Sequence, residues 1–163
     1  RNKDAYYFLP SENEWYKAAY YNPSGTNYFL YPTASSSVPT AVASGTTSGT
    51  AVYGGGAVAE PAAVTLAGGL SPYGTMGQGG NVDEWMESAL DGSNISASGF
   101  RAIRGGYWDE FEDRLRSSSR LGDGPMEEFY AVGFRVASVP EPSTYALLLM
   151  TAASTLWFAR RRR

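Results

Sequence analysis

Gly79-Gly80-Asn81-Val82-Asp83-Glu84-Trp85 is the stretch from which the fold of this chain is read. Its glycines permit tight backbone bends, and such bends turn carbonyl groups toward one point where a hard cation can bind. Glu84 could complete a calcium site of this kind with its carboxylate. The alternative is a glycine turn that carries a buried Trp85 and an exposed acidic pair, because one carboxylate is meagre for calcium.

A helix signal lies upstream, in Leu9-Pro10-Ser11-Glu12-Asn13-Glu14-Trp15. Ser11 can cap the free amides of the first turn, and Glu14, three residues later, completes a capping box. We expect Trp15, Ala18 and Ala19 to share the face that packs inward. The turn Asn22-Pro23-Ser24-Gly25 is expected to end the helix.

A strand signal lies downstream, in residues 100–108, which read Phe-Arg-Ala-Ile-Arg-Gly-Gly-Tyr-Trp. This pattern predicts a short strand that ends in a glycine pair. An acidic stretch follows at 109–113, and Arg114, Arg116 and Arg120 are spaced to pair with it. Residues 132–137 predict a final strand.

The middle of the chain, residues 32–72, is dominated by Ser, Thr, Ala, Gly and Pro and has little hydrophobic periodicity. We expect a long surface excursion there, with short strands at 51–53 and 64–66. A loop of this length is unusual in a compact domain, so regular structure should be sparse.

The composition excludes several classes of function. The chain has no cysteine and no histidine, so it offers no disulfide, no Ser-His-Asp triad and none of the usual zinc ligand sets. Without the four terminal arginines, nine basic residues stand against 16 acidic ones. Such an acidic body argues against nucleic-acid binding, which depends on neutralising phosphates.

The last part of the chain, residues 139–163, begins Val-Pro-Glu-Pro and ends in four arginines. Residues 143–159 are uncharged and mostly apolar, and a helix of that length rises roughly 25 Å, slightly less than a hydrocarbon core of about 30 Å. The arginines favour the cytoplasmic side, which places residues 1–142 across the membrane. Four arginines also argue against a buried core helix, whereas an ordinary membrane anchor stays an alternative.

This tail resembles the PEP-CTERM sorting signal of Gram-negative bacteria, with its motif at Pro140, Glu141 and Pro142, a short hydrophobic helix and a basic end. The resemblance implies recognition by an exosortase, a membrane transpeptidase. It also implies export across the inner membrane, transient anchoring by the helix, and association with the cell surface and exopolysaccharide. Such a tail presupposes an N-terminal export signal, and the chain begins at Arg1 without one, so we expect a C-terminal fragment.

Four motifs in order resemble the formylglycine-generating enzyme (sulfatase-modifying factor) family. They lie at residues 9–15, 79–85, 104–108 (Arg-Gly-Gly-Tyr-Trp) and 133–136 (Gly-Phe-Arg-Val). The resemblance implies an α+β fold of the C-type-lectin-related kind, with short strands, few helices and much irregular chain. The domain would occupy residues 1–138, with its N-terminal part missing, and the hydrophobic helix would follow it.

The resemblance also sets expectations for cofactors. The family's oxidases use a cysteine pair and copper, and relatives bind iron through histidines, so we expect no copper site, no iron site and no catalytic residue here. Gly80, Val82 and Glu84 stand where the family coordinates calcium, which makes Ca²⁺ a candidate ligand. Asp83 replaces a family tryptophan, and Gly77 replaces an expected asparagine ligand.

The preferred hypothesis is an exported, non-catalytic domain that binds a polysaccharide or a protein at the cell surface. In lectin-like relatives the segment between the third and fourth motifs contacts ligands. The candidates here are Tyr107, Trp108, Asp109, Glu110, Phe111, Arg114 and Tyr130. Trp108 and Arg120 have an alternative role as buried or ion-paired fold residues. The competing hypothesis is an enzyme, either a formylglycine-generating-type oxidoreductase or one with a non-cysteine mechanism, and a passive matrix component is a third.

Overall fold

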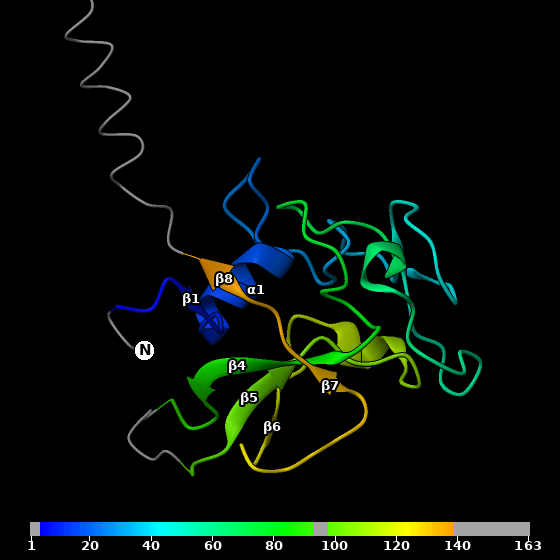
Figure 1. The fold of residues 1–163 in the computed structure, drawn as a ribbon. Helices are drawn as coiled ribbons and strands as arrows, with labels where there is room; N and C mark the ends of the chain where they lie inside the picture. Colours follow the sequence, from blue (N-terminus) through cyan, green and yellow to red (C-terminus); the bar gives the residue numbers. More distant parts are fainter. Residues whose placement is uncertain (1–3, 93–97, 139–163) are drawn as a thin grey trace, which may run out of the picture.

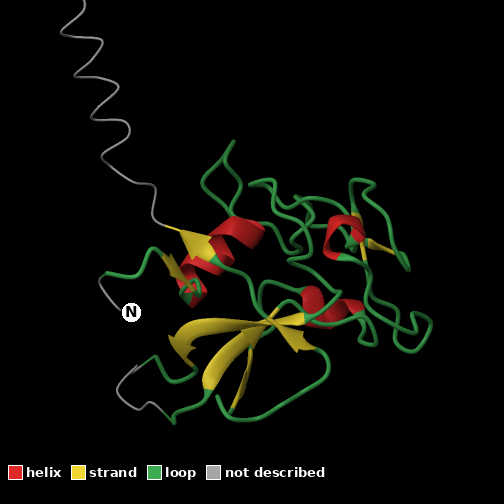
Figure 2. Cartoon of the chain, in the orientation of Figure 1, coloured by secondary structure: helices red, strands yellow, loops and turns green. Residues whose placement is uncertain are grey.

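The computed structural model describes residues 4–92 and 98–138. This part of the chain is a mixed α/β structure with few helices and much irregular chain, as expected (Figure 1, Figure 2). The elements, in order, are β1 (Tyr7–Phe8), α1 (Glu12–Tyr20), β2 (Thr40–Ala41), β3 (Thr50–Ala51), η1 (Val64–Leu66), β4 (Asp83–Ala89), β5 (Arg101–Arg104), η2 (Glu112–Leu115), β6 (Leu121–Asp123), β7 (Val132–Gly133) and β8 (Ala137–Ser138). The predicted C-terminal hydrophobic helix lies outside the described residues.

A four-stranded sheet of order β6-β5-β4-β7 organises the described part of the chain. Its central strand β4 starts inside the 79–85 motif, and β5 pairs with it in the antiparallel sense, with Glu84 opposite Arg104. The parallel strand β7 lies on the other side of β4, with Asp83 opposite Val132. The 79–85 motif therefore supplies an inner strand of the sheet.

The predicted final strand over 132–137 is wrong as one element. Val132–Gly133 belongs to the main sheet as β7, whereas Ala137–Ser138 pairs with β1 in a separate two-stranded ribbon. Between them, Arg135 turns toward Glu84. The chain therefore leaves one sheet and enters another within a few residues.

Helix α1 begins as predicted. The Ser11 side chain accepts from the Glu14 amide, and the Glu14 carboxylate accepts from the Ser11 amide, which completes the capping box. Trp15 and Ala19 are buried, but Ala18 is only half-buried and Tyr20 takes its place in the core. The helix packs these residues against Met86 of β4 and Ala102 of β5.

The stretch 32–72 has little regular structure and is largely exposed, as predicted, but parts of it enter the core. Val52 is fully buried, and other side chains from this stretch join two core clusters with Tyr31, Leu115 and Trp108. Backbone contacts hold this stretch in place, because the Val52 carbonyl accepts a hydrogen bond from the Asn81 amide at 2.7 Å. Residues 64–66 form a 3₁₀ turn rather than a strand.

The predicted arginine pairing holds at one position. Arg114 bonds to Glu110 of the acidic stretch. Arg120 instead binds Glu12 at the start of α1 with two hydrogen bonds, and Arg116 donates to the Tyr31 hydroxyl. The last two partners are distant in sequence, so spacing along the chain could not reveal them.

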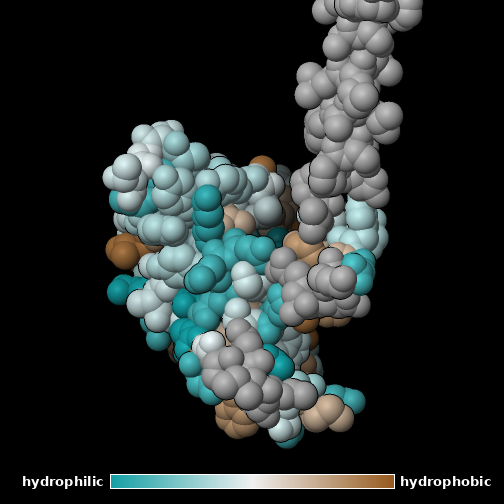
Figure 3. All heavy atoms as spheres, turned by 90° about the vertical axis from the view of Figure 1, so that its left-hand side faces the viewer, coloured by the Kyte–Doolittle hydropathy of each residue, from teal (hydrophilic) through white to brown (hydrophobic). Residues whose placement is uncertain are grey.

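Strands β1 and β8 bring the two ends of the described chain together (Figure 1). They pair in the antiparallel sense, with Tyr7 opposite Ser138 and Phe8 opposite Ala137. The side of the molecule that carries β1 is mostly hydrophilic, with smaller hydrophobic patches between (Figure 3). We refer to this pair of strands as the β1–β8 ribbon.

Candidate ligand-binding site

The turn after β5 positions the predicted site. Gly105 and Gly106 have φ angles of +114° and +74°, a conformation that glycine adopts without strain. The Gly106 amide donates to the Asp83 carboxylate at 2.8 Å, and the Trp108 amide donates to the Asn81 carbonyl at 3.2 Å. The 79–85 motif thus fixes the backbone from which the candidate side chains project.

Asp83 is a buried acid, although an exposed acidic pair was one interpretation of this motif. Its exposed fraction is 4% and that of Glu84 is 5%. Burial raises the pKa of the Asp83 carboxyl to about 6, against the opposing effect of the Gly106 amide. Asp83 therefore connects β4 to the turn before Tyr107, as a structural acid inside the fold.

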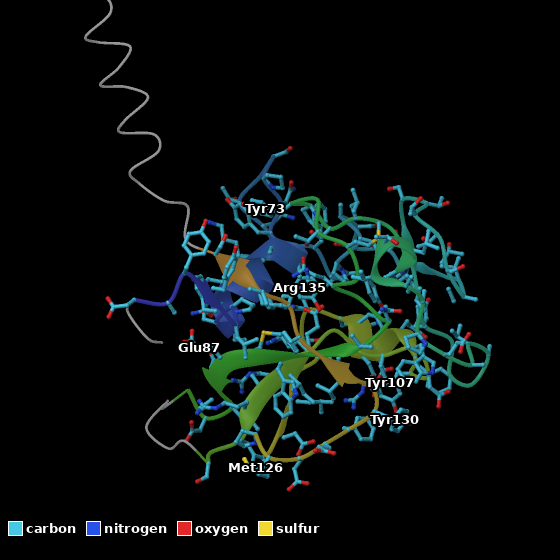
Figure 4. The ribbon with its side chains drawn as sticks, in the orientation of Figure 1. Tyr73, Glu87, Tyr107, Met126, Tyr130 and Arg135 are labelled. Atoms are coloured by element: carbon cyan, nitrogen blue, oxygen red, sulfur yellow. The ribbon has the colours of Figure 1, made fainter. Side chains whose placement is uncertain are left out.

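Four aromatic side chains, Tyr107, Trp108, Phe129 and Tyr130, form what we call the aromatic cluster. Ring centroids lie 5.5 Å apart for Tyr107 and Trp108, 5.7 Å for Trp108 and Tyr130, and 6.0 Å for Tyr107 and Phe129, all in edge-to-face geometry. Figure 4 shows Tyr107 and Tyr130 together beside β7. The structure brings three predicted residues together and adds Phe129, whose only signal in the sequence was its place next to Tyr130.

The aromatic cluster has a buried base and an exposed surface. Trp108 is buried against Val52 and Ala131, as its alternative role as a fold residue predicts. By contrast, 72% of Tyr130 and 44% of Phe129 are exposed. The rigid part of the cluster thus lies in the core, and the accessible part faces solvent.

Charged side chains lie on the rim of the cluster. Glu110 accepts from the Arg114 guanidinium at 2.8 Å and from the Tyr107 amide at 3.3 Å. Burial lowers the pKa of Arg114, but the hydrogen bond and the charge of Glu110 outweigh it and raise that pKa overall. Asp109 beside this pair is exposed.

Phe111 is exposed but lies against a glycine. A Cβ at Gly55 would overlap its ring, and the Gly54 and Gly55 amides both donate to the Glu110 carbonyl. The chain near residue 55 therefore packs against the Phe111 side of the candidate site. Phe111 and Asp109 adjoin this support, whereas Tyr130 lies with the aromatic cluster.

The Glu84 carboxylate, the side chain expected to complete a calcium site, binds an arginine in this structure. Both of its carboxylate oxygens bind the Arg135 guanidinium, at 2.6 Å each, and Trp15 donates its ring N–H to one of them. The Gly80 amide donates to the Gly105 carbonyl, and the partly buried Val82 packs against the core cluster that contains Val52 and Trp108. Among residues 4–92 and 98–138, no group of three or more acidic side chains could hold a metal. Calcium binding thus stays an expectation from the sequence, and the Glu84–Arg135 pair predicts the opposite, a stability that calcium does not change.

Trp85 is half-buried, although burial was part of the glycine-turn interpretation. It lines a hollow of about 510 Å³ together with Met86, Glu87 and Phe134. Glu87 lies toward the other end of β4 from Tyr107 and Tyr130 (Figure 4). The hollow is therefore separate from the aromatic cluster and contains none of the predicted ligand-binding residues.

The sorting motif at Pro140, Glu141 and Pro142, and the apolar stretch 143–159, lie outside the described residues. Within the part of the chain that is described, no helix has the length and apolar character to cross a membrane. Residues 138–163 match the PEP-CTERM protein-sorting motif. This motif indicates export and sorting to the cell surface, and it implies processing by sorting machinery of the exosortase type.

Comparison with known proteins identifies the rest of the chain. No curated protein sequence matches it. Among solved structures, it is similar to Treponema denticola variable protein 1, with 25% sequence identity and a TM-score of 0.58 over 82% of this chain. It spans about half of that protein, 48% of its length. Residues 1–139 match the sulfatase-modifying factor enzyme 1-like domain, and the chain therefore belongs to the formylglycine-generating enzyme (sulfatase-modifying factor) family.

Proposed function

We propose that this domain binds a polysaccharide or a protein at the cell surface, without catalysis, through the aromatic cluster and its charged rim. The observation that carries the proposal is the exposure of Phe129 and Tyr130 on a buried Trp108 base. Large aromatic surfaces exposed on a rigid support are typical of binding sites, because they contribute contact area at little conformational cost.

The chemistry of the rim suits a polysaccharide best. Aromatic rings pack against the C–H faces of sugars, and carboxylates such as Asp109 accept hydrogen bonds from sugar hydroxyls. The Glu110–Arg114 pair is partly exposed and can exchange hydrogen bonds with a ligand at its edge. The same surface accommodates a protein ligand, for which Tyr and Arg are frequent contact residues.

A non-catalytic role agrees with the composition of the chain. It has no cysteine and no histidine, the residue types on which redox chemistry in this family rests. Glu110 bonds to Arg114 and Asp83 to a backbone amide. The contact of Asp83 favours a structural role for that acid, whereas the Glu110–Arg114 pair fits the rim of a binding site.

Glycan and protein arrays probed with the exported domain test this function. We expect binding that Tyr130→Ala and Phe129→Ala each weaken at least about ten-fold, the loss expected of a residue at the centre of an interface. Phe134→Ala is the matched control, because Phe134 is also an exposed aromatic but lines the separate hollow. No binding on either array, or equal losses in all three variants, would overturn the proposal.

A further inference from the structure

We propose that Tyr6 and Tyr7 form a lipid-contacting face, which lies in the headgroup region of the membrane while residues 143–159 anchor the chain. The inference rests on the expectation that residues 143–159 anchor the protein in the membrane before the sorting machinery processes it. It concerns a different surface from the aromatic cluster, and it assigns an orientation to the domain.

The β1–β8 ribbon places this face next to the sorting motif. Tyr7 is the register partner of Ser138, and Cα atoms of such antiparallel partners lie about 4.5–5.5 Å apart. Figure 1 shows β1 and β8 side by side, next to α1. Tyr7 therefore lies across the ribbon from a residue that belongs to the matched sorting segment, residues 138–163.

The connection to the apolar stretch is short. Five residues lead from Ser138 to Ser143, and a fully extended chain of that length spans at most about 18 Å. The headgroup region on each side of a bilayer is about 5–8 Å thick. If Ser143 lies at the edge of the hydrocarbon, Ser138 in the β1–β8 ribbon must lie within about 18 Å of that edge, a distance that includes the headgroup layer.

The side chains on this face have the chemistry of a membrane interface. Tyr6 is 46% exposed and Tyr7 67% exposed, and their rings meet edge to face at a centroid distance of 4.7 Å. Tyrosine is enriched where membrane meets water, because its ring is apolar and its hydroxyl is polar. Two such rings at the attachment point of a membrane anchor fit lipid headgroups better than bulk water.

A single introduced cysteine tests the orientation, because the chain has none of its own. Tyr7→Cys in the chain of residues 1–163, labelled with a fluorophore, is reconstituted in phosphatidylcholine vesicles whose headgroups carry a spin-label quencher. Met126→Cys is the matched control, because Met126 is 88% exposed and lies on the far side of the main sheet from the β1–β8 ribbon (Figure 4). We expect quenching at least about three-fold stronger at position 7 than at position 126, since the quencher is confined to the thin headgroup layer.

Each other outcome overturns the inference in a recognisable way. Equal quenching at both positions, in protein that floats with the vesicles, means that the domain has no fixed orientation. Quenching at position 7 that requires added exosortase means that the face contacts the enzyme instead of lipid. Protein that does not float with vesicles removes the anchored stage itself, while ligand binding on arrays is measured independently. Tyr6→Cys repeats the test if Tyr7→Cys melts at a lower temperature than the native chain.

Discussion

Glu84 and Arg135 form a bidentate ion pair that joins the centre of the main sheet to the segment before β8. Arg135 Nε and Nη2 each donate to one carboxylate oxygen at 2.6 Å, and Nη2 also donates to the Met76 carbonyl. Trp15 of α1 donates to the same carboxylate. One buried carboxylate thus connects the helix, the sheet and the fourth family motif.

The first prediction concerns stability and calcium. Glu84→Gln should lower the free energy of unfolding by about 2–4 kcal/mol, because removal of one partner leaves a partly buried charge without its counter-ion. The loss should be the same in calcium and in chelator, since both carboxylate oxygens already bind Arg135. Urea denaturation in each condition measures it.

The exposed Glu60 provides the control, since Glu60→Gln removes a carboxylate without a buried contact. The free energy of unfolding of that variant should lie within about 0.5 kcal/mol of the value for the native chain. Calcium that stabilises the native domain but not Glu84→Gln would contradict the prediction and support the metal site instead.

Local features of the fold were predictable from the sequence, because their partners are close along the chain. The capping box joins Ser11 and Glu14, which are three positions apart, and it forms as predicted. The glycine pair after β5 likewise marks a turn, because the positive φ angles of this turn are a local property of the two glycines themselves. Such features need no knowledge of the rest of the molecule.

Features that depend on distant backbone contacts were not predictable. Asn81 has a φ angle of +68°, and its side chain accepts from the Ala62 amide while its backbone binds Val52 and Trp108. These bonds order a stretch that has no hydrophobic periodicity, so the burial of Val52 had no signal in the sequence. The Glu84–Arg135 pair was likewise not predictable, because its two residues are 51 positions apart in the sequence.

The second prediction compares two glycines that share a backbone conformation. Gly80 and Gly74 have φ angles of +71° and +77°. A Cβ at Gly80 would overlap the Val52 carbonyl, whereas a Cβ at Gly74 meets no atom within 4 Å. Gly74→Ala should therefore cost only the backbone strain of about 1–2 kcal/mol. Gly80→Ala should cost about 3–5 kcal/mol, because the overlap adds to the strain.

Thermal and urea unfolding of both variants measure the difference. Val52 and Asn81 are bonded to each other beside Gly80, so Gly80→Ala should also disturb Trp108 and weaken any ligand binding at the aromatic cluster. Equal destabilisation of the two variants would mean that the contact between Gly80 and Val52 is not tight in solution.

The third prediction concerns two acids whose pKa values move in opposite directions. Burial raises the pKa of Asp83 from 3.8 to about 6. For Glu12, burial also acts to raise the pKa, but hydrogen bonds from Arg120 and Arg104 and their charges outweigh it, so the pKa is lowered. The folded chain therefore holds the Asp83 proton more tightly than the unfolded chain does, and the Glu12 proton less tightly.

The effects on stability must then have opposite signs. Between about pH 4 and pH 6 the folded state binds more protons at Asp83 than the unfolded state, so its contribution to the free energy of unfolding falls as the pH rises. Asp83→Asn removes this loss and keeps an oxygen that can accept from the Gly106 amide. Relative to the native chain, the variant should thus gain about 1–3 kcal/mol between pH 4 and pH 7. Glu12→Gln should instead lose stability as the pH rises from low values, because the ion pairs with Arg104 and Arg120 then form only in the native chain. Urea denaturation at several pH values measures both differences. Parallel pH profiles for the two variants would show that the pKa of Asp83 is not raised in the folded chain.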